Sequence, residues 1–121
     1  KEIGMTCGNY RIIVNRSKMM RPFYRRPIDI DYNLLMKQNY VACVNLLENM
    51  TSIYKWEDKL EESQEVVIIA KTRKSLMPKL IETVNSLHSY DCVCILQLPI
   101  QGGNSDFLNW IQSETADTEE R

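Results

Sequence analysis

The side chains best suited to chemistry in this sequence are His88, Cys92 and Cys94, which lie close together along the chain. Residues two positions apart on a strand point to the same face, so the thiols of Cys92 and Cys94 would lie side by side. Two thiolates and a nearby imidazole suit a soft or borderline metal such as copper or zinc. Two space-filling cysteines and a histidine that caps a helix would give the same pattern, so both interpretations stay open.

Motifs of enzyme catalysis are missing from the rest of the sequence. The 121 residues contain no Gly-x-Ser-x-Gly, no His-Glu-x-x-His and no phosphate loop of the Walker type. His88 is the one histidine, which excludes a site built from several histidines of one chain. Acidic residues between 57 and 62 are typical of a solvated loop. We therefore predict that the protein is not an enzyme.

Composition narrows the class of protein and its partners. Hydrophobic residues make up 44% of the chain and charged residues 26%, as in a globular domain. The net charge of −1 provides no overall positive electrostatic field that would attract nucleic acid. The basic and aromatic run 21–26 is short, and Pro22 and Pro27 interrupt it. We predict no nucleic-acid partner. No signal peptide is visible, which predicts a cytoplasmic protein, although a chain that begins with Lys1 leaves trimming of its N-terminus open.

Hydrophobic patterns predict alternating strands and helices. Ser75 and Ser105 are the expected N-caps of two helices, and Phe107 and Trp110 are expected to point inward. The order β-α-β-β-α-β-α is the split βαβ pattern, so we predict an α+β, ferredoxin-like sandwich with a long β-hairpin and a C-terminal helix. The expected strands are 10–14, 41–47, 51–56, 66–70 and 92–98, and the expected helices begin at residues 29, 75 and 105.

The second face of this predicted sheet has no cover within the chain. Two helices cover one face, so the strands of a monomer should alternate apolar and polar residues, but 41–47, 66–70 and 92–96 do not. Exposed apolar area costs about 25 cal/mol per Å², and large patches are rare on monomers. We therefore predict a homo-oligomer with Tyr54 and Trp56 as contact anchors. Cover by the C-terminal helix, or helical structure in these runs, is the alternative.

Several motifs of the sequence resemble those of the CutA family of divalent-cation tolerance proteins. Their joint order and spacing, from about residue 39 to 113, are more specific than any one of them. The matching segments are Val41–Asn45 with the family's AACVN strand, Ser52–Lys59 with its S-x-Y-x-W-x-x-K hairpin, Lys71-Thr72, His88-Ser89-Tyr90 with His-Pro-Tyr, Leu98-Pro99-Ile100, Gly103-Asn104, and Leu108 with Trp110.

The resemblance implies a ferredoxin-like trimer related in shape to the PII signalling proteins. It also implies binding of copper or another divalent cation and a role in metal tolerance. The expected ligands are His88 first, Cys94 second and Cys92 third. Tyr90 joins the hairpin aromatic residues as an expected interface residue. Mammalian members of the family are linked to membrane anchoring of acetylcholinesterase, which implies a membrane-associated protein partner.

The sequence departs from the family pattern in three places, one of which is Phe107 in place of a tyrosine near the C-terminal tryptophan. Cys94 occupies the position of a glutamate, so a softer sulfur replaces a carboxylate oxygen, which favours Cu(I) or removes a polar function. Residues 1–38 match poorly, and Cys7 lies too far upstream to replace a cysteine ligand on the family's first strand. We therefore divide the chain into a poorly matched segment with the first strand at 1–28, a CutA-like domain at 29–113 and a polar tail at 114–121.

Two other functions stay open at this point. A regulatory module of PII type would bind a small anionic metabolite or nucleotide between subunits through Lys71, Arg73 or Lys74. A scaffold or trafficking partner of the acetylcholinesterase-anchoring type would need no ligand.

Overall fold

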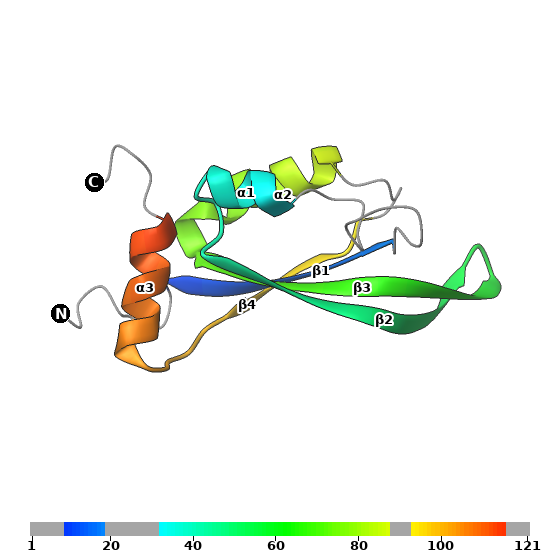
Figure 1. Ribbon diagram of the computed structural model, residues 1–121. Coiled ribbons are helices and arrows are strands. Elements are labelled where there is room, and N and C mark those ends of the chain that lie inside the picture. The colour runs from blue at the N-terminus through cyan, green and yellow to red at the C-terminus, as the bar shows by residue number, and fades with distance from the viewer. Residues whose placement is uncertain (1–8, 19–31, 88–92, 116–121) are drawn as a thin grey trace.

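Four antiparallel strands form one sheet in the order β2-β3-β1-β4 in the computed structural model, which describes residues 9–18, 32–87 and 93–115 (Figure 1). Helices α1 and α2 lie on one face of the sheet, and α3 lies at one end. This is the predicted α+β, ferredoxin-like arrangement. The elements are β1 Tyr10–Lys18, α1 Tyr32–Lys37, β2 Cys43–Trp56, β3 Lys59–Arg73, the 3₁₀ turn η2 Lys74–Leu76, α2 Met77–Leu87, β4 Ile95–Pro99 and α3 Ser105–Thr115.

The hairpin of β2 and β3 is the longest feature of the sheet. It turns at Glu57 and Asp58, whose φ angles of 52° and 65° are the left-handed values that a two-residue hairpin turn requires. Register shifts between Leu47 and Met50, so the two expected strands 41–47 and 51–56 are one strand interrupted by a bulge. Residues 59–64 pair with β2 and lie beyond the β1 register, which starts at Glu65, so the hairpin forms an arm (Figure 1).

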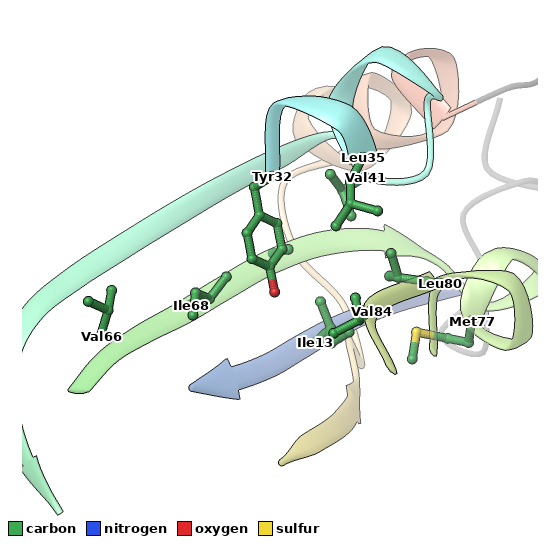
Figure 2. Packing of buried hydrophobic residues seen from close by; sticks show 10 residues of the cluster. Ile13, Tyr32, Leu35, Val41, Val66, Ile68, Met77, Leu80 and Val84 are labelled. Atoms are coloured by element: carbon green, nitrogen blue, oxygen red, sulfur yellow. The ribbon is translucent and has the colours of Figure 1, made fainter. Parts of the chain in front are cut away.

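The main core fills the space between the sheet and the two helices. Ile13 and Ile68 from the sheet, Leu35 from α1, and Leu80 and Val84 from α2 are at most 1% exposed (Figure 2). Full burial of each such side chain contributes about 1.5–3 kcal/mol. The core therefore fixes the helices on this face and leaves the opposite face to other contacts.

Other predicted elements also need correction, since β3 spans Lys59–Arg73 instead of 66–70 and β4 spans Ile95–Pro99 instead of 92–98. β1 continues to Lys18 instead of ending near Val14, because its backbone stays in register with β3. The helix expected to begin at residue 29 is described as α1 from Tyr32, where Leu35 is buried and Leu34 is 39% exposed. Ser75 is not an N-cap but lies inside η2, because Arg73 stays extended and the chain turns directly into a 3₁₀ turn.

A further correction concerns α3. Ser105 is its first residue, and Oδ1 of Asn104 accepts the hydrogen bond from the Asp106 amide at 2.9 Å, so Asn104 is the cap. Phe107 and Trp110 are 45% and 39% exposed and stack on each other. The helix instead buries the side chains of Leu108, Ile111 and Thr115.

Candidate metal centre and self-association surface

Cys94 is the predicted metal ligand that the structure describes. It is a half-buried free cysteine directly before β4, and its carbonyl oxygen accepts a hydrogen bond of 2.6 Å from Nδ2 of Asn15. His88, Cys92 and Tyr90 lie outside the described residues. Among residues 9–18, 32–87 and 93–115, no three His, Cys, Asp or Glu side chains are grouped to hold a metal. The described part of the chain therefore contributes one soft ligand at this place.

A buried polar network behind Cys94 is a feature that sequence analysis missed. The Tyr32 hydroxyl of α1 donates a hydrogen bond of 2.8 Å to Oδ1 of Asn15, which is 0% exposed. Desolvation raises the pKa of Tyr32 well above its ordinary value, so its hydroxyl stays protonated. An asparagine inside the apolar pattern of β1 was the available signal, because a buried amide needs hydrogen-bond partners.

The sheet face opposite α1 and α2 carries an apolar surface. Leu96 and Leu98 of β4 lie opposite Val14 and Ile12 of β1, so their side chains share this face. They are 59% and 51% exposed, and Leu47 of β2 is 56% exposed. We call this the open face of the sheet. Its leucines are the second-face apolar groups predicted from the strands that do not alternate.

Helix α3 covers one end of the open face. Leu108 and Ile111 of α3 pack with Tyr10 and Ala42 in a second buried cluster. Cover of the second face by the C-terminal helix, the alternative to an oligomer, is therefore limited to this end, because Leu96 and Leu98 of β4 remain more than half exposed.

The hairpin arm presents aromatic and aliphatic side chains on both faces. Trp56 is 42% exposed, and Tyr54 is half-buried beneath Arg16, whose guanidinium carbon lies 5.4 Å from the ring centroid. Ile53 and Leu60 point to the other face, where they are 67% and 75% exposed. Exposed aromatic and aliphatic side chains thus lie on both faces of the arm, among charged residues such as Lys55 and Glu61, and aromatic residues are enriched at protein contacts.

The three basic residues proposed for an anionic ligand lie in different surroundings. Lys71 donates from Nζ to Oδ1 of Asn45. Arg73 is 7% exposed and binds Thr115 of α3, with 2.9 Å from Nε to Oγ1 and 2.6 Å from Nη2 to the carbonyl oxygen. Arg73 and Lys74 line a pocket of about 480 Å³ with Asn9, Ser75, Pro78 and Gln112, whereas Lys71 does not.

No helix in the described ranges is long and apolar enough to cross a membrane.

Comparison with known proteins identifies relatives over most of the chain. The mouse protein "Protein CutA" is 41% identical over 81 residues, which are 67% of this chain and 46% of the mouse protein. The "Divalent-cation tolerance protein CutA" of Thermus thermophilus is 40% identical over 81 residues, 67% of this chain and 79% of that protein. The matches to the mouse, cow and human proteins span less than half the length of those relatives.

Solved structures share the fold. CutA1 from Oryza sativa has a TM-score of 0.79 and 29% identity, with 91% of this chain and 96% of that chain covered. CutA1 from Ehrlichia chaffeensis has a TM-score of 0.77 and 27% identity, with 92% and 99% covered. A family model described as "CutA1 divalent ion tolerance protein" matches residues 31–114, which confirms the predicted family. The chain belongs to the CutA1 divalent ion tolerance protein family.

Proposed function

We propose that this chain is a non-enzymatic, homotrimeric protein that binds copper or another divalent cation and acts in metal-ion tolerance. The observation that carries the metal part is the free thiol of Cys94, half-buried directly before β4. The names of the relatives from Thermus thermophilus and Pyrococcus horikoshii, both divalent-cation tolerance proteins, support the cellular role.

The chemistry of the donor set fits a soft metal. Cys94 would supply one thiolate, and His88 and Cys92 would add an imidazole and a second thiolate from the same segment. Such ligands favour copper, above all Cu(I), and also zinc. A bound metal would make the protein a reversible carrier or buffer of that ion, and the thiol must lose its proton to bind.

The trimer is supported by the open face and the hairpin arm. Leu47, Leu96 and Leu98 are more than half exposed on the open face, and the arm adds the exposed side chains of Trp56 on one of its faces and Leu60 on the other. Sister subunits are the occupant we propose, because homo-oligomers with closed symmetry are the usual way to cover such a surface. Tyr54, Trp56 and Tyr90 are the proposed contact residues. The division into 1–28, 29–113 and 114–121 and the cytoplasmic location stay predictions.

Titration of the reduced protein with copper tests the metal site. We expect His88→Ala and Cys94→Ser to bind copper more weakly than the wild type in isothermal titration under anaerobic conditions. Asn85→Ala is the matched control, because Asn85 is an exposed polar residue near the end of α2 and is not a proposed ligand. Equal heats for wild type and His88→Ala would contradict the proposal.

The pocket at Arg73 and Lys74 favours a second candidate, a regulatory module that binds a small anion. We expect ATP to raise the melting temperature of the protein in this case, and metal ions to leave it unchanged. Lys74→Ala should remove the shift, while Lys79→Ala should keep it, because Lys79 does not line the pocket. A trimer that responds to neither ATP nor metal but captures a membrane-associated protein would support the scaffold role instead.

A further inference from the structure

The hairpin arm leaves the sheet at a joint to which three strands contribute. The last described pair between β1 and β3 is Lys18 with Glu65, and the arm projects past this point (Figure 1). The bulge of β2 lies beside it, where Asn49 has a left-handed φ of 64° and the register shifts before Met50. A bulge bends its strand and increases the local twist, so the direction of the arm is set at this joint.

Glu65 places a carboxylate inside the joint. The residue is 1% exposed, and its Oε1 lies 3.1 Å from Nη1 of Arg16 on β1. Removing a carboxylate from water is costly unless an opposite charge pairs with it, so the ion pair holds the guanidinium of Arg16 at this place. A side-chain contact therefore joins β1 to β3 at the root of the arm, in addition to the backbone ladder.

The same guanidinium also contacts the arm itself. Its central carbon is 5.4 Å from the ring centroid of Tyr54, within the range of a cation–π contact. Tyr54 pairs with Glu61, which lies four residues, or roughly 13 Å, from Glu65 along β3. Arg16 thus contacts the hairpin both at its root and within the arm, and two such contacts restrict the direction in which the arm points.

The side of the arm that Arg16 contacts continues the open face of the sheet. Side chains two positions apart on a strand share a face, so Glu61, Glu65 and Val67 of β3 point the same way. Val67 lies opposite Leu47, which is exposed on the open face, and Glu61 lies opposite Tyr54. The direction of the arm therefore decides how its aromatic side chains are placed relative to the leucines of the open face.

We infer that Arg16 is a positioning residue for self-association, because its contacts with Glu65 and Tyr54 hold the arm in the direction in which it meets a sister subunit. This inference rests on the proposed trimer. A fixed arm loses little conformational freedom on assembly, whereas a loose arm has to be ordered at that step. Loss of the Arg16 contacts should raise the concentration at which half of the trimer dissociates by about 10-fold or more, the effect of one lost hydrogen bond to a charged group.

Four variants separate the contacts of Arg16 from one another. Arg16→Met removes both contacts and keeps an apolar stem of similar length. Tyr54→Leu removes the ring and keeps the ion pair, and Tyr54→Phe keeps the ring. Arg11→Met is the matched control, because Arg11 is another arginine of β1 and donates to Gln97 of β4, away from the arm.

The test uses two measurements. Analytical ultracentrifugation over a dilution series gives the concentration of half-dissociation. Hydrogen exchange, read by mass spectrometry, compares the arm at 51–64 with the sheet segment 66–73. Exchange is measured in chains that also carry Leu96→Glu, so that subunit contacts do not protect the arm. Urea unfolding of each variant identifies conditions in which all of them are folded.

We expect Arg16→Met and Tyr54→Leu to dissociate at higher concentration and to exchange faster in the arm, with unchanged exchange at 66–73. Tyr54→Phe and Arg11→Met should match the wild type. If Arg16→Met does not fold, Tyr54→Leu decides, since its ion pair is intact.

Three results would overturn the inference. Wild-type dissociation in Arg16→Met and Tyr54→Leu would remove the positioning role and leave the proposed trimer intact. Exchange that accelerates as much at 66–73 as in the arm would reduce the effect to general stability. A wild type that is monomeric at every concentration would overturn the proposed trimer and this inference together.

Discussion

At Tyr32, a single hydroxyl group decides whether a buried amide oxygen has a partner. Oδ1 of Asn15 accepts its hydrogen bond from this hydroxyl, and Asn15 is 0% exposed. An unpaired buried acceptor costs more than the hydrogen bond itself contributes, because its desolvation is not compensated. Polar groups of this kind make a small part of the core specific for one arrangement of α1 and β1.

Tyr32→Phe should therefore lower the free energy of unfolding by about 1–3 kcal/mol, because it leaves the Asn15 oxygen unpaired. Urea unfolding at neutral pH measures this change. Tyr40→Phe is the comparison, since Tyr40 is half-buried on the edge of the same core, and we expect a change within about 0.5 kcal/mol. A loss at Tyr40 as large as that at Tyr32 would contradict the account.

Stability should also fall at alkaline pH through the same residue. Burial raises the pKa of Tyr32 in the folded protein, whereas the unfolded chain has the ordinary value of about 10. The folded state thus holds the proton more tightly, so this contribution is fully present below about pH 10 and is lost as the pH rises towards the folded pKa. Tyr10, whose pKa is also raised by burial, acts in the same direction.

The stability advantage of the wild type over Tyr32→Phe should consequently shrink between pH 9 and pH 11, because ionisation of the unfolded tyrosine at about pH 10 affects the wild type alone. Urea unfolding of both proteins across this range gives the difference. An advantage that stays constant or grows would show that Tyr32 ionises as easily in the folded state.

At the scale of elements, the ends of helices and strands depend on caps and register. α3 begins one residue after Asn104, whose side chain accepts the Asp106 amide, although Ser105 is also a common cap residue. β1 runs past its apolar segment because β3 offers partners as far as Glu65. Local sequence preference shows which residue types can end a helix or strand. Pairing with the neighbouring backbone determines which of these residues is the actual end.

Asn104→Ala should destabilise the protein by about 1 kcal/mol, and Ser105→Ala should have little effect, because Asn104 alone of the two is the side chain seen to cap α3. Thermal unfolding of the two variants is the measurement. A larger loss of stability in Ser105→Ala than in Asn104→Ala would show that Ser105 is the N-cap, as the sequence pattern predicted.

At the scale of the whole molecule, the two faces of the sheet differ in their exposure to solvent. Ile13, Val66 and Ile68 are buried under α1 and α2, whereas Leu96 and Leu98 of the open face are more than half exposed. Exposed apolar area of this kind favours association through the hydrophobic effect. Assembly is thus the step at which the open face would lose its contact with water.

Leu96→Glu should break the proposed trimer, because a charge placed on the open face would be buried without a partner. Light scattering on a size-exclusion column should give about three times the chain mass for the wild type and about one for Leu96→Glu. Leu34→Glu should leave the assembly intact, since Leu34 is partly exposed on α1, on the opposite side of the sheet. A monomeric wild type would contradict the trimer.

Periodicity and turn chemistry were enough to predict much of the fold. The continuous apolar runs around Ile13 and Ile68 mark strands, and the helical spacing of apolar residues around Val84 marks a helix. The acidic residues from position 57 onward mark the solvated loop in which the hairpin turns. Cys94 was identified as a candidate ligand from its residue type and its spacing from Cys92. Its attachment to Asn15, 79 positions away, was not predicted, because spacing within a segment says nothing about contacts across the sheet.

Order of elements, family and the apolar character of the open face therefore followed from the amino-acid sequence, since each is a property of neighbouring residues and their repeats. The pairing of Tyr32, Asn15 and Cys94, and the selection of Asn104 as a cap, emerged once the chain was folded. A hydrogen bond forms where donor and acceptor lie about 3 Å apart with good alignment. Residues distant in sequence reach this separation when their segments pack together in the folded protein.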